Sequence, residues 1–294
     1  MHRPLASSLL LLITAGGCAI PTSWQPAEFD ACLASEPLLG SDPVHDHRIR
    51  AFLASGLKKL SEDEGTVPFS ELEKQLKRKT CQLDLVAPTT DEISPADLHD
   101  RVIDSIVVVA KRYKCSKCPR WHNRSASGFV VTAGGVIATN YHVLKGEKDT
   151  VLGVMTRNGK VHAVLEVLAA DKENDFALLR MAGTDYQPLP LRAEVRTGEP
   201  VTVISHPSSH YYVLTTGVVS RVSVVGRRAP EISITADYAK GSSGAPVFDA
   251  TGAVIAMGKT TQSVYYSVEK GVQKNLQMVF KNCVAASSIL GAIK

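Results

Sequence analysis

A glycine-rich turn near the C-terminus carries a serine whose surroundings suit acyl-transfer chemistry. Ser243 stands in the turn Gly241-Ser242-Ser243-Gly244-Ala245-Pro246. Glycines adopt backbone angles that side chains forbid, so successive N–H groups can converge on one point beside the hydroxyl. Converging N–H groups form the oxyanion hole that acyl transfer requires. Since Gly/Ser turns are common, the turn indicates a nucleophile only if a base and an orienting group accompany it.

His142 and Asp175 supply those two partners upstream. His142 follows the apolar strand 136–138, and Asp175 immediately precedes the apolar strand 176–179. Taken singly, each residue can also have a purely structural role at an ordinary turn or strand end. The chain order histidine, aspartate, serine is one of the known arrangements of a catalytic triad. The three residues together therefore predict a triad.

The sequence resembles the trypsin-like serine proteases, and more closely their HtrA/Deg-type bacterial branch, over roughly residues 101–290. The resemblance implies His142 as general base, Asp175 as its orienting group and Ser243 as nucleophile. It also implies an oxyanion hole formed by the N–H groups of Gly241 and Ser243, and peptides or proteins as substrates. Five motifs carry it, in the family's order: Ser127-Gly128-Phe129-Val130-Val131, Thr139-Asn140-Tyr141-His142-Val143, Asp175-Phe176-Ala177-Leu178-Leu179, Thr216-Gly217-Val218-Val219-Ser220 and the serine turn.

Two departures from the family pattern lie near the serine. Ala245 stands where a second glycine is usual, and the loop 236–240 is shorter than in HtrA/Deg proteins. Asp237 occupies the place where trypsin-like enzymes that favour Lys or Arg put their pocket acid. The strand Met257-Gly258-Lys259 is expected to line the substrate pocket, where Lys259 would instead favour acidic side chains. The two readings predict opposite substrate preferences.

Short β-rich runs separated by turn signals dominate the chain after residue 101. Such spacing is typical of barrels. We therefore predict an all-β fold, and by resemblance a chymotrypsin-like double β-barrel. The protease domain would span 101–294, with barrels at about 101–185 and 190–290 and the triad in the cleft between them. Because the chain ends at Lys294, we expect no PDZ domain after it.

Residues 19–100 differ from the rest and predict a small helical N-terminal extension. Apolar residues recur at helical spacing over 48–60 and 69–79, and a helix-prone piece over 95–101 leads into the first strand. Residues 86–90 read as a linker. The extension is either a packing appendage or a regulatory segment near the cleft. Cys32 and Cys81 flank the first two helices, and a disulfide between them is predicted if the chain is exported.

The first 18 residues resemble a bacterial lipoprotein signal. A basic start precedes an apolar run at 5–13 that is too short to span a bilayer, and small residues precede Cys18. Cys18 would be acylated, and Ala19 after it favours the outer membrane. We expect a lipid-anchored envelope protein that faces the periplasm, or, after ordinary signal cleavage, a periplasmic or secreted one.

A second cysteine motif lies in the loop expected between the first two barrel strands. Cys115 and Cys118 form a C-x-x-C motif, and His122 follows. A local disulfide is the preferred interpretation, because exported proteins meet an oxidising environment. The alternatives are a zinc site with Cys115, Cys118 and His122 as ligands and Cys283 as a fourth, or unpaired thiols. A thioredoxin-like role is not expected, because no βαβ pattern surrounds the motif.

Composition limits the remaining function classes. The chain is 44% hydrophobic and 21% charged, with a net charge of +4. These are ordinary globular values, and the charge is too mild to indicate a nucleic-acid partner. We expect a serine endopeptidase without a cofactor, and nothing in the sequence indicates its oligomeric state. The alternative is a catalytically silent or latent protease fold that acts as an envelope binding or adaptor protein.

Overall fold

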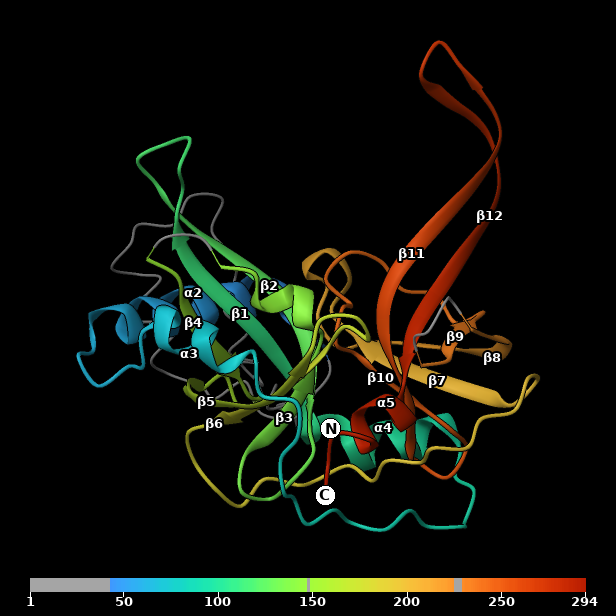
Figure 1. The fold of residues 1–294 in the computed structure, drawn as a ribbon, viewed down its shortest axis with the longest axis horizontal. Helices are drawn as coiled ribbons and strands as arrows, with labels where there is room; N and C mark the ends of the chain where they lie inside the picture. The colour runs from blue at the N-terminus through green and yellow to red at the C-terminus, as the bar shows by residue number, and fades with distance from the viewer. Residues whose placement is uncertain (1–42, 147–148, 225–228) are drawn as a thin grey trace, which may run out of the picture. The chain divides into compact units, whose positions relative to one another are not determined.

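Short antiparallel strands account for most of the chain in a computed structural model, which describes residues 43–146, 149–224 and 229–294. Twelve strands form two closed barrels of six strands each (Figure 1). A small group of helices precedes them in the sequence. The predicted all-β fold, a chymotrypsin-like double barrel with a helical N-terminal part, is confirmed.

The first barrel contains β1 to β6, in the order β1-β2-β3-β6-β5-β4. Side chains on β1 alternate between two apolar clusters, as the period of a strand requires. Val107 and Val109 join a cluster of first-barrel residues, whereas Ile106 and Val108 join a cluster shared with the helices and the second barrel. The strands are β1 (Ile106–Lys114), β2 (Trp121–Val130), β3 (Val136–Thr139), β4 (Val151–Met155), β5 (Val161–Asp171) and β6 (Phe176–Met181).

The second barrel contains β7 to β12, in the order β10-β11-β12-β9-β8-β7. Its last two strands differ from the sequence prediction. Two of the β-rich runs of the sequence, 254–257 and 264–268, belong to one long strand, and no predicted run corresponds to β12. The strands are β7 (Pro200–Ser205), β8 (Val213–Ser223), β9 (Glu231–Ile234), β10 (Pro246–Phe248), β11 (Val254–Glu269) and β12 (Val272–Ala285).

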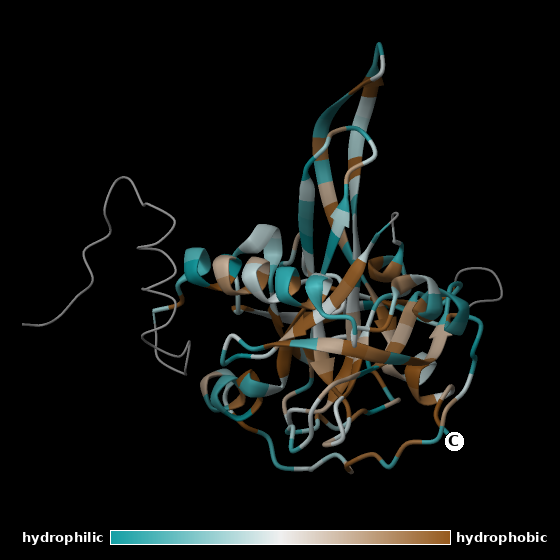
Figure 2. Cartoon of the chain, turned by 90° about the vertical axis from the view of Figure 1, so that its left-hand side faces the viewer, coloured by the Kyte–Doolittle hydropathy of each residue, from teal (hydrophilic) through white to brown (hydrophobic). Residues whose placement is uncertain are grey.

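Beyond the barrel, β11 and β12 continue as a two-stranded ribbon, residues 262–280, that extends away from the other strands (Figure 1). The ribbon carries both polar and apolar side chains along its length (Figure 2). Tyr266 is 78% exposed, and Val268, Val272, Leu276 and Met278 are also exposed. No residue of the ribbon is buried on either face.

Three helices of the N-terminal extension pack onto the barrels. The helix α2 (Asp46–Glu62) buries Leu53 and Leu57 against the first barrel, and α3 (Phe69–Gln75) buries Leu72. A Cβ on Gly56 would lie 2.3 Å from Val161, so α2 sits very close to β5. The expected helix over 69–79 ends earlier. The remaining elements are α4 (Pro95–Val102), α5 (Ala286–Leu290) and three short turns, η1 (Ile103–Ser105), η2 (Tyr141–Leu144) and η3 (Pro207–Ser209).

The segment between α3 and α4 runs along the C-terminal part of the chain without forming a helix. The backbone of Cys81 forms an isolated parallel β-bridge with Ile293, and the Ile93 amide donates to the Ala250 carbonyl. The predicted Cys32–Cys81 disulfide and the predicted lipid-bearing Cys18 involve residues outside the described ranges. Within those ranges, no helix has the length and apolar character needed to cross a bilayer.

Candidate active site

The first barrel positions the predicted base and its orienting group on adjacent strands. His142 lies in η2, directly after β3, and Asp175 lies directly before β6, which pairs with β3. Asp175 Oδ2 is 2.8 Å from His142 Nδ1, and Asp175 Oδ1 accepts from the His142 amide at 3.0 Å. A carboxylate bound to both groups fixes the orientation and the tautomer of the ring. The Nε2 atom is therefore left as the proton acceptor.

Asp175 reaches this place through an unusual backbone conformation. Its φ is 60°, in the left-handed region that Asp and Asn tolerate better than other side chains. The buried Asn140 side chain donates from Nδ2 to the Asp175 carbonyl at 2.9 Å and so braces the turn. The sequence Asn174-Asp175 at the head of a strand is thus suited to the bend that aims the carboxylate.

The second barrel brings the predicted nucleophile to His142. Ser243 Oγ is 2.9 Å from His142 Nε2, within hydrogen-bond reach. The same hydroxyl lies 3.3 Å from the Lys259 carbonyl. Lys259 sits at a β-bulge, where the pairing shifts between Gly258 and Thr260. The structure thus brings together all three residues of the predicted triad.

The turn around Ser243 is one that only glycine accommodates at two positions. Gly241 has a φ of +101° and Gly244 a φ of +90°. A Cβ on Gly244 would lie 2.0 Å from the Ser127 carbonyl oxygen, and one on Gly241 would lie 2.5 Å from the His206 carbonyl oxygen. Ala245, which stands where the family usually has a second glycine, is fully buried in the second-barrel core. Its side chain is therefore accommodated.

The amides predicted to form the oxyanion hole are available. The Ser208 amide donates to the Lys240 carbonyl at 2.6 Å. Because N–H and C=O point in opposite directions across a trans peptide, the Gly241 N–H points away from Ser208. Neither the Gly241 amide nor the Ser243 amide donates to another residue within the described ranges. Both can therefore serve a substrate oxygen.

Ser127, for which no role was predicted, links the two barrels at this turn. Its amide donates to the Ser243 carbonyl at 2.8 Å, and its hydroxyl donates to the Gly241 carbonyl at 3.1 Å. The hydroxyl also accepts from the His206 amide at 3.2 Å. Ser127 lies on β2 in the first barrel, whereas its partners belong to the second. Its place in a family motif was the available signal, but backbone contacts cannot be read from residue type.

His206 is a second supporting residue that the sequence interpretation missed. Its ring is fully buried, and Nδ1 accepts from the Tyr212 amide at 3.1 Å while Nε2 lies 3.3 Å from the Val107 carbonyl. Burial lowers the pKa of the His206 imidazole to about 4, so the ring is neutral at physiological pH. Nearby, Ser208, Ser209 and Tyr212 have positive φ. The polar run 205–210 after an apolar strand was the available signal.

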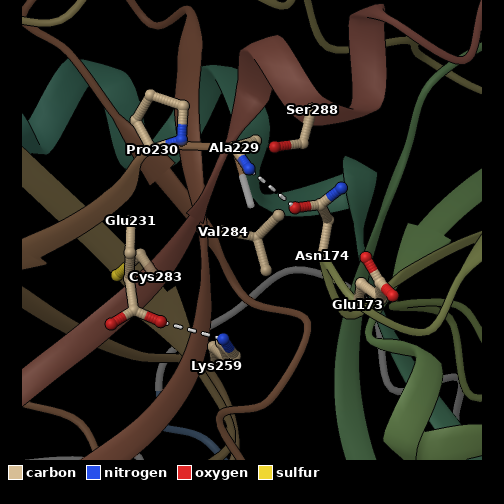
Figure 3. A pocket seen from close by; sticks show the side chains of 9 residues that line it. All are labelled: Glu173, Asn174, Ala229, Pro230, Glu231, Lys259, Cys283, Val284 and Ser288. Atoms are coloured by element: carbon tan, nitrogen blue, oxygen red, sulfur yellow. Dashed lines mark hydrogen bonds and ion pairs between the residues drawn. The ribbon is translucent and has the colours of Figure 1, made fainter. Parts of the chain in front are cut away.

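A pocket lies between Glu173 and Asn174 of the first barrel and residues of the C-terminal half of the chain, among them Lys259 (Figure 3). Lys259 lines it, and its Nζ is 2.8 Å from Glu231 Oε2. The Asn174 side chain accepts from the Ala229 amide. Also in the lining, Cys283 is fully buried, and burial raises the pKa of its thiol to about 12. The pocket thus contains both signs of charge.

The other three residues predicted to line the substrate pocket, Asp237, Met257 and Gly258, do not line the pocket of Figure 3. Asp237 has an 85% exposed side chain that pairs with Lys281 at 3.3 Å, so its carboxylate points to solvent. Met257 is buried in the core, and Gly258 contributes backbone against the serine turn through its bond from the Gly244 amide. Of the four residues, Lys259 is the one that lines the pocket of Figure 3.

The cysteine motif between β1 and β2 differs from the preferred expectation. No disulfide joins Cys115 and Cys118. Their sulfur atoms instead cluster with the His122 ring. Cys283, considered as a fourth zinc ligand, is buried in the second-barrel core beside Tyr238 and is not part of this cluster.

The amino-acid sequence is similar to those of known peptidases. Residues 126–257 match the trypsin-like peptidase domain. A probable periplasmic serine endoprotease, DegP-like, of Hahella chejuensis is 31% identical over 147 residues, which are 47% of this chain and 30% of that protein. Serine protease HTRA1A of Danio rerio is 25% identical over 256 residues, which are 81% of this chain and 51% of that protein.

The fold has a similar solved structure. An HtrA-type protease, AlgW, solved with a decapeptide, superposes with a TM-score of 0.54 and 18% identity. The superposition covers 67% of this chain and 65% of that one. The chain spans about half or less of the length of the two curated relatives described.

Proposed function

The chain carries a trypsin-like peptidase domain of the HtrA type, and on that premise we propose that it is a serine endopeptidase that works through His142, Asp175 and Ser243. The observation that carries the proposal is the continuous chain of two hydrogen bonds from Asp175 through His142 to Ser243. The available amides of Gly241 and Ser243 beside that chain support it further.

The chemistry follows from these positions. Ser243 Oγ attacks the peptide carbonyl carbon while His142 Nε2 takes the hydroxyl proton. The carbonyl oxygen becomes an oxyanion, which the Gly241 and Ser243 amides stabilise. His142 then gives its proton to the leaving amine, and an acyl-enzyme on Ser243 remains. Water, deprotonated by His142, hydrolyses the ester and restores the serine. Asp175 stabilises the imidazolium in both halves of the reaction.

Labelling with a fluorophosphonate tests this assignment, because the reagent modifies only an activated serine. Intact mass spectrometry of the wild type should detect one adduct, and Ser243→Ala and His142→Ala should both abolish it. Peptide hydrolysis by Ser243→Ala should fall by about 10⁶, as it does when another serine protease loses its nucleophile. Ser263→Ala, on the exposed ribbon, is the matched serine control and should label normally.

Absence of an adduct on folded wild-type protein would contradict the proposed activity. It would favour the silent or latent protease fold, which circular dichroism would distinguish from unfolded material. An adduct that persists in Ser243→Ala would instead assign the nucleophile to another serine.

We also propose that the protein is exported and held in the cell envelope by acylation of Cys18. The signal-like residues 1–18 support this, as do relatives whose names describe periplasmic proteases. Several acyl chains, at about 0.8 kcal/mol per buried methylene, would hold it firmly. Mass spectrometry of the mature N-terminus should find an acylated cysteine, and Cys18→Ser should move the protein to the soluble fraction. An unmodified N-terminus on soluble wild-type protein would refute the anchor.

A further inference from the structure

Three soft metal-ligand groups meet at the tip of the hairpin between β1 and β2. The Sγ atoms of Cys115 and Cys118 and a ring nitrogen of His122 all lie within 4.8 Å of one another. Cys118 Sγ is 3.2 Å from His122 Nε2. All three side chains are partly exposed, so a dissolved ion can reach them. The proposed peptidase chemistry uses none of them.

We propose that this hairpin tip binds a zinc ion through the Cys115 and Cys118 thiolates and His122 Nε2. Tetrahedral zinc, with Zn–S of about 2.3 Å and Zn–N of about 2.0–2.1 Å, needs ligand atoms roughly 3.5–3.8 Å apart. The observed cluster is compatible with that spacing. A set of thiolate and imidazole ligands selects zinc over magnesium or calcium, which prefer oxygen. The fourth position is taken by water, as in other zinc sites with three protein ligands.

The hairpin holds these ligands in place before any ion arrives. The Cys115 amide donates to the Arg120 carbonyl at 3.1 Å and closes the loop. The Lys117 amide donates to Cys115 Sγ at 3.4 Å. The His122 ring stacks on Tyr113, with centroids 5.8 Å apart and planes 25° apart. Contacts of this kind orient metal ligands and increase metal affinity.

The charge balance also fits zinc. When Zn²⁺ binds, the two thiols lose their protons to solvent, so the ion and two thiolates together carry no net charge. Lys114, Lys117 and Arg120 flank the cluster. Their positive charges attract thiolates, and the neutral complex places no additional cation beside them. A site made only of neutral ligands would keep the full 2+ charge of the ion beside these cations.

The same geometry argues against the disulfide that the sequence favoured. Cys118 Sγ lies 3.2 Å from His122 Nε2, a contact that a shared metal ion explains and that a Cys115–Cys118 disulfide does not require. His122 lies on β2 and both cysteines lie in the loop before it, so the ion would tie the loop to the strand. The metal would therefore act as a structural cross-link of the hairpin tip.

Metal analysis of the untagged chain, purified without chelator or reductant, tests the proposal. We expect about one Zn²⁺ per chain. Cys118→Ser and His122→Ala should each lower zinc affinity at least 10–100-fold, roughly the range seen when only the groups supporting the ligands are changed. Cys81→Ser, a partly buried thiol outside the cluster, is the matched control and should keep its zinc. Cobalt substitution should produce thiolate-to-metal charge-transfer bands that disappear in Cys118→Ser.

Two outcomes would overturn the zinc site. One is zinc-free protein whose mass is lower by two hydrogens, with a Cys115–Cys118 disulfide found by peptide mapping. The other is zinc-free protein in which both thiols react and added zinc binds no tighter than in His122→Ala. Because His122 lies on the surface hairpin, that variant should stay folded, and circular dichroism checks this.

Discussion

The two barrels hold their parts of the active site by different means. The first barrel fixes His142 and Asp175 through side chains, since the Asp175 carboxylate binds the ring and the Asn140 side chain donates to the Asp175 main-chain carbonyl. The second barrel fixes Ser243 through its backbone, in a turn that depends on Gly241 and Gly244. The positions of His142 and Asp175 are therefore sensitive to the loss of a side-chain functional group. The position of Ser243 is sensitive to a carbon atom added at a neighbouring glycine.

Replacing the Asp175 carboxylate should have the largest effect among changes that test this contrast. Asp175→Asn keeps the shape but removes the charge and favours the wrong tautomer of His142, so kcat should fall about 10⁴-fold, going by another serine protease. Steady-state peptide hydrolysis measures this. Asp185→Asn, at another aspartate with positive φ, is the matched control. A loss of less than tenfold would show that Asp175 does not orient the base.

Adding one methyl group to the serine turn should cause the next largest loss in kcat. In Gly244→Ala the Cβ meets the Ser127 carbonyl, so the turn must shift and the oxyanion hole is lost. The expected loss in kcat is about 10²–10³-fold, the cost of losing an oxyanion donor. Gly271→Ala is a matched control, because Gly271 also has positive φ but has nothing within 4 Å of the added carbon. Equal losses in the two variants would contradict the clash.

Acid should weaken the second barrel through His206. The folded-state pKa of about 4 lies below the ordinary value of about 6.5. The stabilising effect of the neutral ring is therefore complete above pH 6.5 and is lost as pH falls toward 4. That loss is on the order of 3 kcal/mol in the free energy of unfolding. Urea unfolding at several pH values, compared with His206→Gln, measures it. A His206 ring that titrates near pH 6.5 by NMR would refute the mechanism.

Removing the contact between the barrels should have the smallest effect. Ser127→Ala deletes the hydroxyl bonds to the Gly241 carbonyl and from the His206 amide but keeps the amide bond to Ser243, so the turn loosens without collapsing. At about 1 kcal/mol for the one bond that holds Gly241, kcat should fall five- to tenfold, with little change in KM. Ser125→Ala, two residues earlier on β2, serves as the control. A rise in KM with unchanged kcat would indicate a binding role instead.

Sequence patterns predicted the parts of the fold that depend on burial and on motif order. Apolar strands such as β1 and β6 were found because their side chains are buried. The strand β12 was missed because Gln273, Lys274, Asn275 and Gln277 are exposed in the ribbon, where no face requires alternation. Asp237 was placed in a pocket by its distance along the chain from Ser243, but its carboxylate pairs with Lys281 at the surface.

The candidate site was predicted as far as its side chains act directly. The proposed triad occurs in motifs, and its three members meet in the structure. The side chains of Ser127 and His206 bind amide and carbonyl groups of other residues, which every residue type possesses, so residue types alone do not identify these partners. The cysteine motif allowed a disulfide or a metal site, and only the position of His122 relative to both sulfur atoms favours one of them.

The ribbon beyond the second barrel has a mechanical consequence. Its strand β11 connects the exposed Tyr266 to Lys259, whose carbonyl contacts the Ser243 hydroxyl. The pairing of β11 with β12 shifts at Lys259 and again between Val264 and Tyr265, and such bulges bend a strand. A displacement of the ribbon's outer end would therefore reach the backbone beside Ser243 through the ladder that β11 and β12 share.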